Sequence, residues 1–393
     1  MKHRTITRRN ELARFCDELT GEPSIAIDTE FVAEHTYRPV LCLVQVATRE
    51  QLVLIDAMTI PDVTPFWQTV VEGDHETIIH AARSELEFCL DAAGALPARL
   101  FDVQVAAGLI GAEYPAGYNS LIGRLLGEKP GKHETRTDWR RRPLSHRQID
   151  YALDDVRFLH PLRDTIYDAL VHSGRLGWLE EEMGAVREGF SATRAGERWR
   201  RVSGNAGLKP RQLAVVRALW QWRDAEAGRR DKPARYVLRD DLIIELARRA
   251  SADPAQILSL RGMERGDLRR RVDELSAAVE QALELPEEQL PQPLRRERTQ
   301  DYSVLGQFLF AALGSLCREA NLAPALVGTP NDIRDLITYN TSESKATGNV
   351  PRLGRGWRAE FVGRLFDDLL AGKVAISVGD ACSESPLRFE RGE

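Results

Sequence analysis

The chain has 393 residues, of which 43% are hydrophobic and 29% charged, and its formal net charge is −5 at pH 7. This length predicts two or three domains, and no run approaches the roughly 18 uncharged apolar residues that a membrane span requires. The negative net charge, considered alone, argues against nucleic acid as a ligand, because phosphate binding favours a positive surface. Five dispersed cysteines without a CxxC pair indicate reduced thiols in a cytosolic protein and disfavour a disulfide framework or a zinc site.

The N-terminus is positively charged but has no apolar stretch after it, so a signal peptide is not expected. Strand-like and helix-like segments follow it. Apolar, β-branched stretches predict strands at 24–28, 41–47, 51–56 and 77–80. Helical periodicity predicts helices at 84–93, 102–111, 118–126 and 146–170. This combination predicts an α/β domain with a mixed sheet.

Only helices are predicted after residue 207. Glycine, serine and arginine at 186–206 predict a linker, and two helical blocks follow at about 207–285 and 300–380. A proline-rich segment separates the blocks and is expected to be extended. Residues 235–249 and 324–337 share an apolar turn, a polar cap and a helix, which predicts an internal repeat.

Two carboxylates end the first predicted strand, in the sequence IAIDTEF. Asp28 and Glu30 are two residues apart, so both project from one face of the strand while Thr29 points to the other. Like charges this close repel each other unless one is protonated or a cation lies between them. The alternative is a solvated strand end, but the flanking Ile27 and Phe31 indicate partial burial and so favour a functional pair.

Two further segments carry candidate residues. Tyr151 and Asp155, in IDYALDDVRFL, are four residues apart and share one helix face. Asp154 is rotated by about 100° and is expected to point elsewhere. Glu85, in HAARSELEFCL, lies in the first turn of a helix, where the helix dipole favours an anion. Taken singly, core packing and the dipole explain these residues better than catalysis does, and only their combination indicates an active site.

In this order the three segments resemble the motifs of the DEDD exonuclease superfamily, and specifically its ribonuclease D branch, which has tyrosine in the third motif. The first motif corresponds to residues 25–31, the second to 80–90 and the third to 151–155. The helical blocks resemble the HRDC domain, an accessory nucleic-acid-binding module of that family, most clearly over residues 209–241. The resemblance therefore spans nearly the whole chain.

The resemblance implies a fold of the α/β class. A ribonuclease H-like exonuclease domain with a mixed sheet is expected at residues 1–188. Two small all-α domains are expected to follow it, a first HRDC domain at 207–286 and a second, HRDC-like domain at 300–380.

The resemblance also implies a 3′→5′ exoribonuclease that releases 5′-nucleoside monophosphates, with tRNA 3′ maturation as the expected role. Two Mg²⁺ or Mn²⁺ ions are the implied cofactors. The implied metal ligands are Asp28, Glu30, Glu85 and Asp155, and the implied catalytic residues are Asp28, Glu30, Asp155 and Tyr151. The implied partners are single-stranded RNA 3′ ends and tRNA precursors, for a cytoplasmic enzyme with no membrane contact and no obligate protein partner.

Position 85 departs from the family pattern, which presents Asp five residues after the histidine of the second motif. Glu85 retains a carboxylate on an arm one methylene longer, and a hard cation needs oxygen ligands at a fixed distance. The longer arm implies binding through water or a small shift of the metal. Asp102 is the nearest other Asp, at a position expected to be structural.

Alternatives to this interpretation stay open. A DNA-directed 3′→5′ exonuclease uses the same carboxylates, and Glu85 allows a weakly active or inactive RNA-binding relative. Basic segments at 132–147, with six Lys/Arg against two acids, and at 193–211, with six against one, are candidates for contacting the RNA backbone. Phe31 is expected either to stack on the terminal base or, in the simpler interpretation, to pack in the core.

Overall fold

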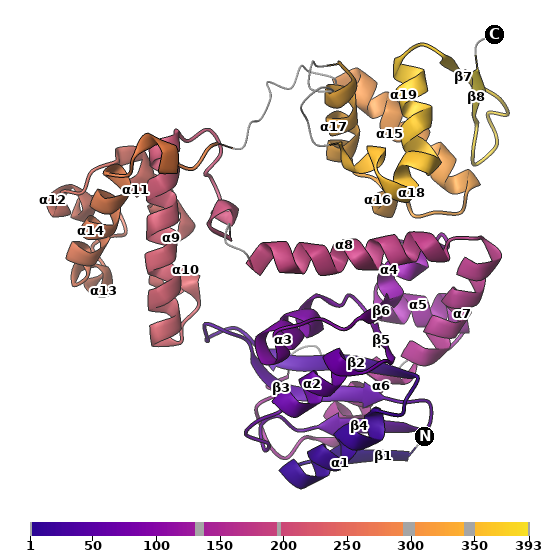
Figure 1. Ribbon diagram of the computed structural model, residues 1–393, viewed down its shortest axis with the longest axis horizontal. Helices are drawn as coiled ribbons and strands as arrows, with labels where there is room; N and C mark the ends of the chain where they lie inside the picture. Colours follow the sequence, from indigo (N-terminus) through magenta and orange to yellow (C-terminus); the bar gives the residue numbers. More distant parts are fainter. Residues whose placement is uncertain (1, 130–136, 195–197, 294–302, 342–349, 392–393) are drawn as a thin grey trace.

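The computed structural model describes residues 2–129, 137–194, 198–293, 303–341 and 350–391. Figure 1 shows an N-terminal part built on a sheet, a helical bundle that follows it, and a second bundle that lies along the long helix α8 (Leu176–Arg194). Within the described residues, no helix combines the length and the apolar character needed to cross a membrane.

The N-terminal part contains one mixed sheet of six strands in the order β1-β4-β3-β2-β5-β6. The strands are β1 (Lys2–Ile6), β2 (Ser24–Val32), β3 (Val40–Ala47), β4 (Gln51–Ile55), β5 (Glu76–Ile79) and β6 (Arg99–Asp102). β2 pairs antiparallel with β3 and parallel with β5, so it occupies the middle of the sheet. The four strands predicted from the sequence correspond to β2, β3, β4 and β5, and the predicted mixed sheet is confirmed.

Helices cover both faces of this sheet (Figure 1). They are α1 (Arg9–Leu19), α2 (Thr64–Glu72), α3 (Arg83–Ala93), α4 (Val103–Gly108), α5 (Tyr118–Leu121), the π-helical turn η1 (Ile122–Leu126), α6 (His146–Arg157), α7 (Leu159–His172) and α8. Thr29 of β2 bonds to a residue of α3, whereas Ser24, five residues earlier in the same strand, bonds to a residue of α7. Since side chains alternate along a strand, α3 and α7 lie on opposite faces of β2.

Helix α6 begins at a capping box. The Ser145 hydroxyl accepts a hydrogen bond from the Gln148 N–H at 3.2 Å, and the Gln148 side-chain oxygen accepts one from the Ser145 N–H at 2.9 Å. The single helix predicted at 146–170 is two helices, α6 and α7, which meet at Phe158.

Two helical bundles follow. The first contains η2 (Arg198–Arg201), α9 (Pro210–Arg230), α10 (Ala234–Val237), α11 (Asp240–Arg249), α12 (Pro254–Leu258), α13 (Gly266–Arg269), α14 (Val272–Leu283) and η3 (Glu287–Gln289). The second contains α15 (Ser303–Glu319), α16 (Pro324–Val327), α17 (Pro330–Thr341), η5 (Arg352–Gly354), α18 (Gly356–Arg358), η6 (Ala359–Gly363), α19 (Arg364–Leu370), β7 (Val374–Val378) and β8 (Leu387–Arg391). Each bundle begins with a long helix that is followed by a helix of four residues. After a gap of two residues a longer helix begins, and this shared order supports the predicted repeat.

Three expectations about the second half of the chain are wrong. The segment predicted as a linker from residue 186 belongs to α8 as far as Arg194. Tertiary packing overrides its composition, since Val186 and Phe190 pack against the apolar core. The proline-rich segment, expected to be extended, contains the 3₁₀ turn η3, and its residues 294–299 lie outside the described residues. The region expected to be helical throughout ends in the antiparallel hairpin of β7 and β8, whose first strand is β-branched in alternation.

The two bundles meet the N-terminal part in different ways. The second shares one continuous apolar core with it, and Trp357 stacks on Trp178 of α8 with 4.6 Å between the ring centroids. The first has a separate core, and the loop between β2 and β3 contacts it where the Tyr37 N–H donates to Asp231 at 3.1 Å. The predicted domain boundaries stay predictions, although the first of them, residue 188, lies within α8.

Candidate active site

Carboxylates from three elements lie together near the end of β2. Asp28 and Glu30 project from one face of this strand, and Thr29 points to the other, as the sequence predicted. Glu85, from the first turn of α3, and Asp155, from α6, lie close enough to Asp28 for each to raise its pKa. The structure therefore brings together the carboxylates that the sequence singled out.

Burial is the main cause of the raised pKa values in this cluster. It raises the pKa of Asp28 well above its usual range, and Glu85, Asp155 and Glu30 raise it further. Burial, then Asp155 and Glu85, raise the pKa of Glu30 to about 8. Burial also raises the pKa of Glu85, which is only 4% exposed, and that of Asp155 to about 7 each. Ionisation of these four groups is therefore unfavourable unless a cation compensates their charge.

Tyr151 lies one turn before Asp155 on α6, and its hydroxyl donates a hydrogen bond to that carboxylate. Burial, followed by Asp155, Glu30 and Asp28, raises the pKa of Tyr151 above its ordinary value of about 10. The hydroxyl therefore stays protonated at neutral pH. In this structure the Tyr151 hydroxyl is a hydrogen-bond donor to Asp155.

The long arm of Glu85 is held by a neighbour on β2. The Thr29 hydroxyl donates to the Glu85 carboxylate at 2.6 Å, in a buried contact across 56 residues of sequence. In the turn before α3, the N–H groups of Ala81 and Ala82 donate to the Asp102 carboxylate at 3.1 and 3.0 Å, and Ala81 has a φ of 57°. Asp102 thus has the structural role expected of it, since it fixes a strained turn from which α3 presents Glu85.

The donor set of this cluster suits a hard divalent cation, because it consists of carboxylate oxygens. A bound cation would also relieve the mutual repulsion that raises these pKa values. Among the residues that the structure describes, no three His, Cys, Asp or Glu side chains are drawn together closely enough to form a metal site as they stand. The carboxylates are within electrostatic reach of one another, but in this structure their oxygens do not converge on one cation position.

Tyr118 belongs to this site, although its sequence context offered no reason to single it out. Its hydroxyl donates to the Asp154 carbonyl at 3.2 Å and accepts from the Phe158 N–H at 3.3 Å, so it ties α5 to the end of α6. Burial raises its pKa, and Asp155 and Asp28 add to the effect. Only the tertiary fold brings α5 to this place.

Gln45 is a second residue that sequence reasoning missed. It lies directly opposite Asp28 in the pairing of β2 with β3, so both side chains project from the same face. It is fully buried, and neither polar atom of its side chain has a hydrogen-bond partner within the described part of the chain. One amide in the otherwise apolar stretch LCLVQVA was the signal that could have found it.

We expect Gln45→Met to raise the melting temperature of the protein in EDTA. Burial of an unpartnered amide costs about 1–3 kcal/mol, and methionine fills a similar volume without a polar group. Circular dichroism melting in EDTA measures the change. The matched control is Gln148→Met, which removes a buried amide that is bonded to Ser145 and Thr137 and should lower the melting temperature. A lower melting temperature for Gln45→Met as well would show that Gln45 is satisfied after all.

The basic segment 132–147 is partly structural. Arg142 donates to Asp56 at 2.6 Å and to the Cys42 carbonyl at 2.9 Å, and its side chain is only 21% exposed. The expectation that this segment contacts RNA is therefore wrong for Arg142, whose charge is already compensated in a buried pair. Residues 132–136 lie outside the described residues.

The basic segment 193–211 also contains both a structural arginine and exposed arginines. Arg211 donates to the carbonyls of Leu283 and Leu285 and so joins two helices of the first bundle. Arg198 and Arg201 are exposed. These two arginines remain candidates for contacting a ligand.

Two smaller expectations concern Asp154 and Phe31. Asp154 pairs with Arg157 at 2.7 Å, while its charge also raises the pKa of Asp155. Its expected orientation away from the site stays a prediction. Phe31 packs edge-on against Phe88 of α3, with 5.6 Å between the ring centroids. This contact supports the packing interpretation of Phe31, and stacking on a terminal base stays a prediction.

Comparison with known protein families matches the chain at two places. The family model described as 3′-5′ exonuclease matches residues 3–170, which contain all the carboxylates of the site. The family model described as HRDC domain matches residues 212–279, within the first helical bundle.

Whole-chain relatives share the same arrangement. Proteins named Ribonuclease D from Granulibacter bethesdensis and Acidiphilium cryptum are 33% identical over 378 residues and 34% identical over 376 residues, and each alignment covers 95% of this chain and 94% of the relative. The crystal structure of Escherichia coli RNase D, described as an exoribonuclease involved in structured RNA processing, superimposes with a TM-score of 0.80 at 30% identity. That superposition covers 95% of this chain and 99% of the E. coli chain.

Proposed function

This chain belongs to the ribonuclease D family and is a 3′→5′ exoribonuclease, and we propose that it releases 5′-nucleoside monophosphates from RNA 3′ ends by two-metal catalysis. Family membership implies dependence on a divalent metal ion. The observation that carries the finer proposal is the convergence of Asp28, Glu30, Glu85 and Asp155, whose buried carboxyl groups have raised pKa values. Such a cluster is stable in its ionised form only with positive charge among its members.

Each residue has a distinct part in the proposal. Asp28, which all three other carboxylates approach, would contact both ions, Glu30 and Asp155 would hold the first, and Glu85 would support the second. When bound, Mg²⁺ or Mn²⁺ ions would activate the attacking water and stabilise the charge that develops on the phosphorus centre. Tyr151, protonated and anchored to Asp155, would orient the attacking water through its hydroxyl.

Matched oligonucleotides test this proposal. An RNA and a DNA of the same sequence, each labelled at the 5′ end, are incubated with Mg²⁺, with Mn²⁺ and with EDTA. We expect stepwise shortening of the RNA from its 3′ end, release of 5′-nucleoside monophosphates and no reaction in EDTA. Equal or faster degradation of the DNA would favour the DNA-directed alternative, since discrimination rests on contacts to the 2′-hydroxyl.

We further propose tRNA precursors as a physiological substrate. The support is the similarity over nearly the full length to E. coli RNase D, whose structure is described as that of an exoribonuclease involved in structured RNA processing. A tRNA transcript with a short 3′ trailer should be trimmed to a product that ends near the acceptor stem. Complete degradation of the folded tRNA at the same rate as an unstructured RNA would contradict this role.

We expect Glu85→Asp to lower the rate of RNA hydrolysis about tenfold or more. The shorter side chain withdraws the carboxylate by about one methylene, loses the bond from Thr29, and even a displacement of about 1 Å at a reacting centre can cost 10²-fold. Initial rates and the Mg²⁺ concentration that gives half-maximal rate measure the effect. Glu72→Asp, at the exposed end of α2, is the matched control. A large gain in rate for Glu85→Asp would instead show that the native residue handicaps the site.

A further inference from the structure

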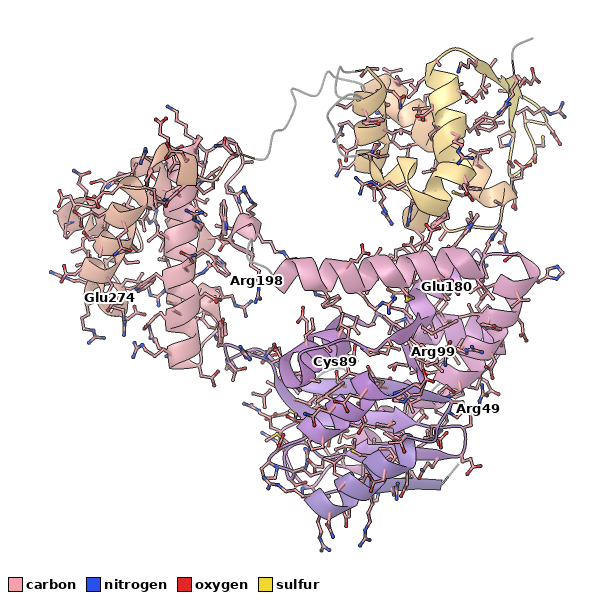
Figure 2. The ribbon with its side chains drawn as sticks, viewed as in Figure 1. Arg49, Cys89, Arg99, Glu180, Arg198 and Glu274 are labelled. Atoms are coloured by element: carbon pink, nitrogen blue, oxygen red, sulfur yellow. The ribbon has the colours of Figure 1, made fainter. Side chains whose placement is uncertain are left out.

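A cavity of about 470 Å³ lies between α3, α8 and the segment that leads into the first helical bundle. Four arginines line it, together with aromatic and apolar side chains from other elements. Figure 2 shows Arg198 beside the end of α8, on the side of the first bundle. A cavity of this size lies within the range of about 300–1,000 Å³ that is typical of ligand sites, so it can hold a nucleotide-sized group.

The cavity is positively charged in a chain whose net charge is negative. Arg38, Arg83, Arg198 and Arg201 line it, against the two carboxylates Glu87 and Asp91. The carboxylates are weak partners: Arg83 lies 3.3 Å from Glu87 and Arg38 lies 3.9 Å from Asp91, and in both pairs the arginine side chain is about 70% exposed (71% and 69%). Exposed pairs of this kind contribute little, so the arginines can exchange these partners for phosphate oxygens.

One side of the cavity is apolar. Val186 and Phe190 of α8 face Leu90 of α3, and the Tyr37 ring from the loop between β2 and β3 lies at the edge nearest the first bundle. Arginines beside aromatic rings are the combination with which proteins bind single-stranded nucleic acid, because the arginines track the backbone and the rings contact bases or ribose.

Helix α3 links this cavity to the catalytic carboxylates. Its buried face presents Glu85, and its exposed face presents Arg83 and Glu87 to the cavity. The two sites therefore lie on different faces of one helix, which is about 10–12 Å across with its side chains. An RNA strand whose 3′ end is at the carboxylates can therefore reach the cavity with nucleotides a short distance upstream.

We propose that this cavity binds the sugar–phosphate backbone of single-stranded RNA upstream of the scissile 3′-terminal linkage. Arg38 and Arg198, which both lie near Tyr37, hold phosphates, and the apolar side chains of α8 receive a base or ribose. The site lies where the exonuclease part and the first bundle meet, so it guides RNA between them. This inference rests on the proposed exonuclease function and adds to it a backbone site outside the catalytic carboxylates.

The test uses the full-length double variant Arg38→Gln/Arg198→Gln and the control Arg9→Gln/Arg14→Gln, which removes the same charge from exposed positions on α1. Fluorescence anisotropy in EDTA measures affinity for a 12-nucleotide and a 3-nucleotide oligouridylate over a range of salt concentrations. For the 12-mer we expect about a tenfold loss of affinity in the cavity variant, and a salt dependence whose slope falls by about 1.4, since each lost phosphate contact on a single strand contributes about 0.7. For the 3-mer we expect unchanged affinity and, with Mg²⁺, an unchanged rate of hydrolysis.

Several outcomes would overturn the inference. These are equal affinity of wild type and cavity variant for the 12-mer, the same loss in the control variant, or the same loss with the 3-mer. The first would show that the two arginines do not contribute to binding, the second that they act only through overall charge, and the third that they contact the terminal nucleotide. Absence of hydrolysis by the wild type would instead contradict the proposed function, and the binding measurements would still decide whether the cavity holds RNA.

Discussion

Replacement of Asp28 by asparagine will reduce RNA hydrolysis by about 10³-fold or more and will raise the melting temperature of the protein in EDTA. The substitution keeps the size of the side chain but removes the negative charge that all three other carboxylates surround. Catalysis falls because the proposed contact to both metal ions is lost. Stability rises because a buried carboxyl group with like charges around it is unfavourable without a cation.

Asp154→Asn is the matched control for this variant. It makes the same change beside Asp155, but Asp154 pairs with Arg157 and is not one of the proposed metal ligands. Its activity should stay within a few-fold of wild type, and its melting temperature in EDTA should not rise. Retention of hydrolysis by Asp28→Asn would remove Asp28 from the mechanism, and a fall in its melting temperature would show that the carboxylate stabilises the fold without metal.

In EDTA the protein will lose stability as the pH rises from about 5 to 8, and Mg²⁺ will restore it. The pKa of Glu30 is raised to about 8, and those of Glu85 and Asp155 to about 7, from unfolded values near 4. Between these limits the folded state holds protons that the unfolded state has released, so stability is greatest below the unfolded pKa and falls as the pH rises through the folded pKa. Melting temperatures at several pH values, with and without Mg²⁺, measure the effect.

The gap between the two melting curves should widen with pH, because Mg²⁺ replaces protons in the site. Glu30→Gln/Asp155→Asn is the control, since it removes two of the titrating groups and should flatten the pH dependence in EDTA. A wild-type profile in EDTA that is flat, or that rises with pH across this window, would show that these carboxylates are already compensated by groups within the protein.

Sequence spacing predicted correctly which side chains share a face within one strand or one helix. The alternation in IAIDTEF predicted that Asp28 and Glu30 share a face, and the spacing of Tyr151 and Asp155 predicted that they share another. Weak signals were missed. β1, with the polar sequence KHRTI, is a strand only because it pairs with β4 at the edge of the sheet. The end of α8 resembles a linker in composition and is helical because Val186 and Phe190 pack against the apolar core.

The sequence by itself determined the catalytic candidates, the α/β class with its mixed sheet, and the repeated helical pattern, because spacing along one strand or helix is a local property of the chain. Tertiary structure alone decided which side chains surround them. The Thr29 bond that holds Glu85, the unpartnered Gln45 opposite Asp28, and the Tyr118 hydroxyl at the end of α6 all join segments far apart in the chain. Sequence spacing carries no information about such contacts, since they depend on how strands pair and how helices dock on the sheet.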